Sequence, residues 1–121
     1  MKELIMKTLT SDYTKVLVEE EFQYSAPHSF RVIDAKTEEA ICEIHFQEGP
    51  IKECGVNGVA NEDLLNMVLC RLQHFQDSKY SCPENTAAVA YIEKALQELR
   101  ARTNKRIALG VEGTSAPGNN S

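Results

Sequence analysis

Apolar and polar residues alternate in three short segments in the first half of the chain. Residues 14–18 read TKVLV, residues 29–34 read SFRVID, and residues 40–46 read AICEIHF. Alternation with a period of two and many β-branched side chains are typical of strands that bury one face. A polar turn at residues 36–39 separates the last two segments, and a Gly-Pro pair ends the third. The pattern predicts a short antiparallel β-meander.

Helical spacing begins after a loop marked by two glycines. Asn61 is expected to be the N-cap of a helix, because its side chain can accept a hydrogen bond from a free N–H of the first turn. Apolar residues then recur at intervals of three and four, and they are Leu64, Leu65, Val68, Leu69, Leu72 and Phe75. The helix is predicted to end near Gln76, before a polar loop.

A second, longer helix is predicted from Ser81 to Leu109. Ser81 and Glu84 have the spacing of a capping box, and Pro83 is tolerated in a first turn. The segment is rich in Ala, Leu, Glu, Gln, Lys and Arg, which favour helices. Gly110 is a typical residue to follow the last turn.

These elements predict an α+β fold, in which the β-meander is followed by a two-helix hairpin. We expect one domain with a β-rich part over residues 1–56, the hairpin over 57–109, and a GVEGT segment with a flexible tail over 110–121.

The long helix carries an apolar stripe spaced by four, three and four residues, formed by Ala88, Ile92, Ala95 and Leu99. The same spacing continues to Arg102 and Arg106, so both arginines are predicted to extend the buried face. The stripe is too long for so small a β-rich part to cover. We therefore expect at least a dimer, since two-fold pairing is the commonest closed assembly.

Charge is unevenly distributed along the chain. Residues 1–63 hold 13 acidic and 6 basic side chains, whereas residues 64–121 hold 5 acidic and 7 basic side chains. Residues 100–106, RARTNKR, hold four basic residues and no acidic one. The net charge of −5 argues against a general DNA or RNA binder, whereas the basic segment would attract a small anionic ligand.

Arg102 and Arg106 are four residues apart and therefore share a helix face. Two guanidinium forks in this arrangement suit a diphosphate. The alternative is a solvated helix end whose cations complement the negative end of the helix dipole.

Two further residues are candidates for the same ligand. Phe75 could stack on a base, although an aromatic residue at this spacing is more often part of a core. Asn85 could read a polar edge, because its amide both donates and accepts, or it could cap the helix locally.

Catalytic and metal-binding patterns are not evident. The sequence holds no P-loop, GxGxxG, HExxH or nucleophile-elbow motif, and we expect no enzyme and no cofactor. Cys70 and His74 have the spacing of a metal pair, but buried or half-buried free thiols are the simpler interpretation of the four cysteines, and we expect no metal.

Neither a membrane nor a secretory pathway is indicated by the sequence. No apolar run approaches the ~20 residues that a membrane span requires. The start, MKELIMKTLT, is too short and too interrupted for a signal peptide. We expect a cytosolic chain with reduced thiols.

Several fixed spacings in the second half resemble a known family. The segments GPIKECGVNGVANEDLLNMVLCRLQHFQ, CPENTAAVAYIEKALQELRARTNKR and GVEGT resemble the type I Thoeris anti-defence proteins of bacteriophages. The hairpin is also similar to that of the phage anti-CBASS cyclic nucleotide sponge. The resemblance covers roughly residues 14–114.

The resemblance implies a binding function in the cytoplasm of the host bacterium. Family members sequester, without cleaving, a cyclic ADP-ribose isomer (glycocyclic ADP-ribose) made by the TIR-domain enzyme of Thoeris defence. They form dimers that can build hexamers. By the resemblance, Phe75 stacks on adenine, Asn85 hydrogen-bonds the ligand, and Arg102 and Arg106 hold the phosphates.

A second site for cyclic trinucleotides of CBASS is also implied for some members. It is lined in part by the GVEGT region, here Gly110, Gly113 and Thr114. The family pattern has a basic residue directly before this first glycine, whereas this chain has Leu109. The resemblance therefore supports the second site less strongly than the first.

Two rival functions remain open at this point. An enzyme that degrades the same signal would need a general base or a metal near the phosphates. A protein-interaction module would use the hairpin as a seam and bind no small molecule.

Overall fold

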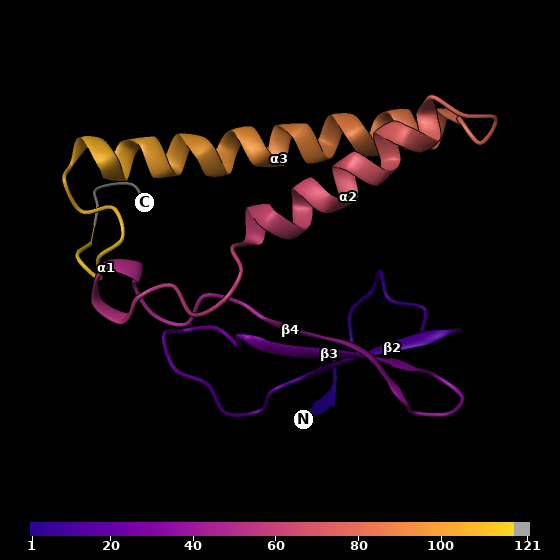
Figure 1. Cartoon of the computed structure of the whole chain (residues 1–121), viewed down its shortest axis with the longest axis horizontal. Coiled ribbons are helices and arrows are strands. Elements are labelled where there is room, and N and C mark those ends of the chain that lie inside the picture. Colours follow the sequence, from indigo (N-terminus) through magenta and orange to yellow (C-terminus); the bar gives the residue numbers. More distant parts are fainter. Residues whose placement is uncertain (118–121) are drawn as a thin grey trace. The chain divides into compact units, whose positions relative to one another are not determined.

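The computed structural model describes residues 1–117. They divide into two compact units, Met1–Val59 and the part of the chain that begins at Ala60. Among the described residues, the first unit holds four strands and a short helix, and the second holds two long helices (Figure 1). The predicted α+β class is confirmed.

The sheet is an antiparallel meander of β1 (Lys2–Glu3), β2 (Thr14–Val18), β3 (Ser29–Asp34) and β4 (Ala40–His45), in the order β1-β2-β3-β4. The predicted ranges of β2 and β3 are confirmed residue for residue, and β4 ends one residue before the predicted end. The two-residue strand β1 was not predicted, because so short a segment carries no periodic signal.

One face of the sheet gathers apolar residues from three strands. Val18 pairs with Phe30, and Phe30 pairs with Ile44. Paired residues point to the same side of a sheet, and Val18 is only 5% exposed. The Phe30 and Phe46 rings pack edge to face with their centroids 5.5 Å apart. This unit therefore has a small core of its own.

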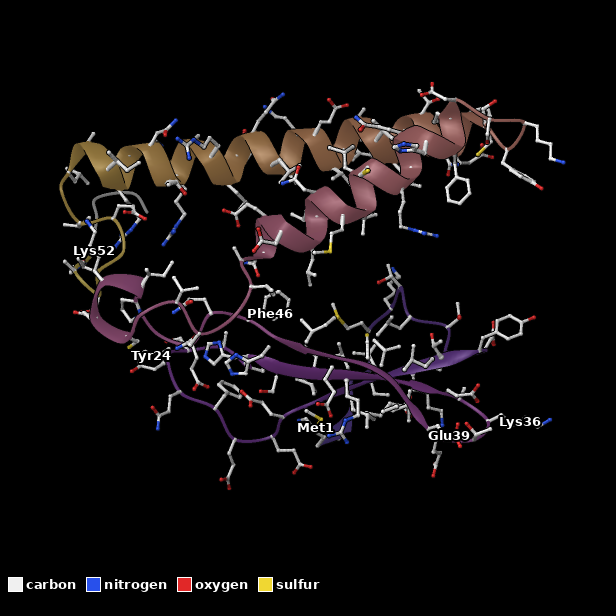
Figure 2. All side chains as sticks on the ribbon, in the orientation of Figure 1. Met1, Tyr24, Lys36, Glu39, Phe46 and Lys52 are labelled. Carbon is white, nitrogen blue, oxygen red and sulfur yellow. The ribbon has the colours of Figure 1, made fainter. Side chains whose placement is uncertain are left out.

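The connection between β3 and β4 is a tight polar turn, as predicted (Figure 2). The Asp34 carboxylate accepts hydrogen bonds of 2.8 Å from the backbone N–H groups of Lys36 and Thr37. The bonds from Thr37 and Lys36 hold the pKa of this carboxyl below its ordinary value. Asp34, which is half-buried, thus stabilises the turn through hydrogen bonds from the backbone of the turn.

A short helix, α1 (Ile51–Cys54), precedes the loop glycines Gly55 and Gly58 and was not predicted. Beyond it the chain returns to the sheet, where Phe46 and Val59 form a parallel bridge. Gly58 is required by this close approach, because a Cβ atom there would lie 2.5 Å from the backbone of Phe46.

Helix α2 (Asn61–Gln76) ends where the sequence predicted, but its start is capped differently. The N-cap is Ala60, so the prediction that Asn61 is the N-cap is wrong. The Asp63 carboxylate accepts a hydrogen bond of 2.8 Å from the Ala60 N–H. This return bond closes the first turn and moves the cap one residue earlier.

Gln76 joins α2 to helix α3 (Pro83–Ala108). Its Oε1 atom accepts a 3.1 Å bond from the Cys82 N–H, and its Nε2 atom donates to the Cys82 carbonyl at 3.1 Å and to Thr86 Oγ1 at 2.7 Å. Cys82 is the N-cap of α3 and makes no side-chain cap bond. The predicted capping box of Ser81 and Glu84 is therefore wrong, because the Gln76 amide fixes the turn instead.

The two helices face each other through half-buried residues spaced by three and four, which are Leu65, Leu69 and Leu72 on α2 and Val89, Ile92, Leu96 and Leu99 on α3. Ala95 and Arg102, predicted to lie on the buried stripe, are exposed. The inner face of α3 follows a seven-residue repeat (residues 92, 99 and 106) and therefore passes through Arg106 and not Arg102.

The second unit is poorly covered. Within its described residues no apolar side chain is buried, and several large ones are exposed, namely Met67, Val68, Phe75, Tyr91, Ile107 and Leu109. None of the helices in residues 1–117 is both long and apolar enough to cross a membrane. An isolated helical hairpin with so little burial is marginal in water.

We predict that Gln76→Ala destabilises the protein by about 1–3 kcal/mol, because it removes three hydrogen bonds that join α2 to α3. The measurement is the free energy of unfolding in urea. Gln73→Ala is the matched control, since Gln73 is exposed on the same helix, and it should change stability by less than about 0.5 kcal/mol. Equal losses in both variants would contradict the role given to Gln76.

Candidate ligand-binding site

The four residues predicted to hold the ligand lie at opposite ends of the helical unit. Phe75 is in the last turn of α2 and Asn85 is in the first turn of α3, whereas Arg102 and Arg106 are in its last two turns. At ~1.5 Å per residue, Arg102 lies roughly 26 Å and Arg106 roughly 32 Å along the helix from Asn85. The structure therefore places each pair at one end of the hairpin and keeps the two pairs apart within one chain (Figure 1).

Phe75 is an exposed aromatic platform at the turn of the hairpin. Its side chain is 39% exposed, so it is not a core residue. The Arg71 guanidinium carbon lies 5.5 Å from the ring centroid, which is a cation–π distance. The Ser78 hydroxyl donates a 2.6 Å bond to the Phe75 carbonyl and fixes the end of α2. The ring is thus held in place while remaining accessible for stacking.

Asn85 is half-buried, directly after the first two residues of α3. Among residues 1–117 its side-chain amide makes no hydrogen bond, so the local-cap interpretation finds no support. An amide that is partly desolvated has both a donor and an acceptor to offer to a polar ligand edge.

The two arginines have different environments. Arg102 is exposed, whereas Arg106 is only 8% exposed. The Arg106 Nη2 atom donates to three backbone carbonyls, those of Val111 and Thr114 at 3.1 Å each and that of Ala116 at 2.9 Å. The spacing of residues along the helix could not predict these bonds. It places Arg106 on the inner face but carries no information about a loop that folds back onto it.

The loop after α3 is folded from its first residue. The Gly110 N–H donates to the Ile107 carbonyl and the Val111 N–H donates to the Arg106 carbonyl, each at 3.0 Å. Together with the positive φ of 72° at Gly110, this is a Schellman motif. The predicted C-terminal glycine signal is confirmed.

Gly113 and Thr114, the other expected residues of a second site, belong to the same folded loop. Gly113 has a φ of 75°, and the Thr114 hydroxyl donates a 2.6 Å bond to the Val111 carbonyl. The flexible tail expected within residues 110–121 includes residues 118–121, which lie outside the described residues. Residues 110–116 form hydrogen-bonded turns.

A cavity of about 560 Å³ opens on the flank of the hairpin away from Phe75, and it was not predicted. It is lined by Gln73, His74, Gln76, Asp77, Thr86 and Val89. Phe75 is two residues from both Gln73 and Asp77, so it points roughly 200° away around the helix. The cavity is therefore separate from the surface that carries Phe75.

The arrangement of the cysteine and histidine side chains in the described residues is not typical of a metal site. Cys70 Sγ lies 3.8 Å from His74 Nδ1, but the Cys70 carbonyl is closer, at 2.9 Å. In the described part of the chain, no three His, Cys, Asp or Glu side chains come together as metal ligands. The four cysteines are not joined in disulfides. Cys42, Cys54 and Cys70 are exposed and only Cys82 is half-buried, so the expectation of buried or half-buried thiols is wrong for the first three.

Comparison with known proteins identifies relatives of this chain. The family model of the Acb2/Tad1 hairpin domain matches residues 38–107. A protein of Bacillus phage SBSphiJ7, described as Thoeris anti-defense 1, is 37% identical over 139 aligned positions that cover 94% of this chain and 98% of the relative.

We predict that Arg106→Ala loosens the loop at residues 111–116, because the three carbonyls lose their common donor. Amide hydrogen exchange at residues 111–116 should become faster, while exchange in the middle of α3 should not change. Arg102→Ala is the control and should leave the loop unchanged. Unaltered exchange in the Arg106 variant would contradict the loop contact.

Proposed function

This chain belongs to the Acb2/Tad1 hairpin family, and from that premise we propose that it is a phage immune-evasion protein that acts on Thoeris defence. It binds glycocyclic ADP-ribose, a cyclic ADP-ribose isomer made by the TIR enzyme, and sequesters it without cleavage in the cytoplasm of the infected bacterium. The defence effector that responds to this signal then stays inactive.

One observation supports this proposal most directly: the hairpin has an exposed aromatic ring and an amide at one end, and two arginines at the other. An aromatic face stacks on adenine, an amide reads a polar edge, and guanidinium forks bind phosphates. A cyclic ADP-ribose isomer offers an adenine base, polar edges and a diphosphate. Arginine stays protonated and cannot act as a general base, so these residues favour binding over turnover.

The separation of the two ends implies that one ligand contacts two protomers. A compact macrocycle cannot span the roughly 26 Å between Asn85 and Arg102 along α3. A second copy related by a two-fold axis, with its hairpin antiparallel to the first, brings the tip of one protomer to the arginines of the other. Such an isologous arrangement creates two equal sites.

The exposed apolar side chains of the second unit support the same dimer. Clustered apolar residues on a surface commonly mark an interface. The exposed Ala95 lets a partner helix approach α3 closely. Dimers of this kind can associate further into the hexamer known in the family.

Binding without turnover is tested by release of the ligand. The protein is incubated with glycocyclic ADP-ribose, freed of unbound ligand and heated, and the supernatant is analysed. We expect intact ligand in the supernatant. Altered ligand would instead indicate an enzyme, and absence of ligand would indicate the rival function, a protein-interaction module formed by the hairpin.

The loop with Gly110, Gly113 and Thr114 is a second candidate site, for cyclic trinucleotides. The family supports this proposal, whereas the exposed Leu109 at the position of a basic residue weakens it. A calorimetric titration with a cyclic trinucleotide tests it, and Leu109→Arg should strengthen any binding by adding a phosphate ligand.

We predict that Arg102→Ala and Arg106→Ala each weaken binding of glycocyclic ADP-ribose roughly ten- to a hundredfold, the equivalent of about 1.5–3 kcal/mol for a lost charged hydrogen bond. Lysine should recover only part of this, because an ammonium cannot form a planar fork. Isothermal titration calorimetry measures both effects.

Arg100→Ala is the matched control for this series. Arg100 lines the other flank of the hairpin, together with Asn66 and Thr103, so its loss should have a small effect that fades with salt. Equal weakening in all three alanine variants, seen only at low salt, would mean a diffuse field and no defined site.

We predict that two variants with weakened binding restore full-affinity sites when they form a mixed dimer. Phe75→Ala and Arg102→Ala chains, produced together, should recover about a quarter of the wild-type sites, because half of the dimers are mixed and each has one intact site. Counting bound ligand per protomer measures the recovery.

Phe75→Ala produced together with Asn85→Ala is the control for this experiment. Both changes lie in the same half of a site, so every site in the mixed dimer stays damaged. Recovery here, or its absence in the first mixture, would contradict a site built by two protomers.

A further inference from the structure

The strongest unassigned feature of the molecule is the set of carbonyls around Arg106. Three carbonyl oxygens, those of Val111, Thr114 and Ala116, accept hydrogen bonds from the single atom Nη2. We call these residues, 111–116, the carbonyl cradle. A guanidinium has five N–H donors, of which Nη2 carries two. The remaining donors, one N–H on Nε and two on Nη1, are not used by these three carbonyls.

Thr114 ties the cradle together. Its hydroxyl donates a 2.6 Å bond to the Val111 carbonyl and accepts a 3.3 Å bond from the Ala116 N–H. The Thr114 side chain thus connects the two other residues whose carbonyls hold Arg106. Without the hydroxyl, the spacing of the three acceptors would depend on the backbone alone.

We propose that the carbonyl cradle positions Arg106 for a ligand phosphate, and that Thr114 is a positioning residue of the nucleotide site. This rests on the proposed function, which places Arg106 at the phosphates. The cradle holds the guanidinium by Nη2 and leaves the Nε and Nη1 donors for single hydrogen bonds to a phosphate. Three carbonyl dipoles also stabilise the positive charge of a side chain that is only 8% exposed.

The physical gain is preorganisation. A free arginine side chain loses considerable rotamer entropy when it is fixed on a ligand, whereas Arg106 is already fixed before the ligand arrives. Arg102 is exposed, and within residues 1–117 no backbone carbonyls hold its guanidinium. Of the two arginines, Arg106 should therefore contribute more to affinity, and Arg106→Lys should recover less than Arg102→Lys.

The test compares Thr114→Val with Thr114→Ser in the full-length protein, using glycocyclic ADP-ribose as the probe in calorimetric titrations. Valine keeps the shape of threonine and removes the hydroxyl, and it should weaken binding roughly three- to tenfold. Serine keeps the hydroxyl and should bind within about twofold of the wild type. Equal affinity of the valine variant and the wild type would overturn the proposal.

A double-mutant cycle separates positioning from a general loss of stability. If Thr114 acts through Arg106, Thr114→Val should weaken binding in the Arg102→Ala background and have no further effect in the Arg106→Ala background. An equal effect in both backgrounds would overturn the proposal. A wild-type protein that binds no glycocyclic ADP-ribose would instead refute the proposed function, so the two failures are distinguishable.

Discussion

An uninterrupted helix, α3, sets the distance on which the proposed mode of binding depends. Between Pro83 and Gly110 the sequence contains no glycine or proline, so nothing kinks or weakens the helix over its 26 residues. Helix α3 therefore keeps the aromatic end and the arginine end of the hairpin at a fixed distance. A ligand that uses both kinds of residue has to meet them on different protomers, and binding and assembly become one problem.

At each end of α3, a polar side chain forms hydrogen bonds with the backbone of the adjoining loop. At the turn of the hairpin, the Gln76 amide bonds both backbone polar groups of Cys82. At the other end, the Arg106 guanidinium bonds three carbonyls of the final loop. Both side chains come from the inner faces of the helices, so the same face that packs the hairpin also shapes its two ends.

The two units of the chain differ in how they obtain stability. The sheet buries Val18 and Ile33 and holds its turn with the Asp34 carboxylate. The hairpin buries no apolar side chain within its described residues. Because the hairpin buries so little, apolar surface remains on it, and this is the surface that a second copy is proposed to cover. The acidic excess of the first 63 residues and the basic helix end agree with the proposal that an anionic ligand binds the hairpin.

Local sequence patterns were enough to predict the strands at 14–18 and 29–34, the end of α2, and Gly110 as the residue that ends α3. These features depend on local periodicity and on backbone preferences that a few neighbouring residues decide. The sequence also pointed to Phe75, Asn85, Arg102 and Arg106 as candidates, two through spacing on one helix face and all four through resemblance. The helix N-caps were harder to predict from the sequence, because the positions of Ala60 and Cys82 depend on hydrogen bonds made by the side chains of other residues.

The exposure of Ala95 and Arg102 and the burial of Arg106 follow from the packing of the helices and could not be predicted from the sequence. Which residues of a helix face inward depends on how its partner crosses it, and several stripes fit the same apolar pattern. The hydrogen bonds from Arg106 to Val111, Thr114 and Ala116 join residues whose contact requires the chain to reverse direction after α3. No local periodicity encodes such a return, because the bonds exist only once the loop has folded back on the helix end.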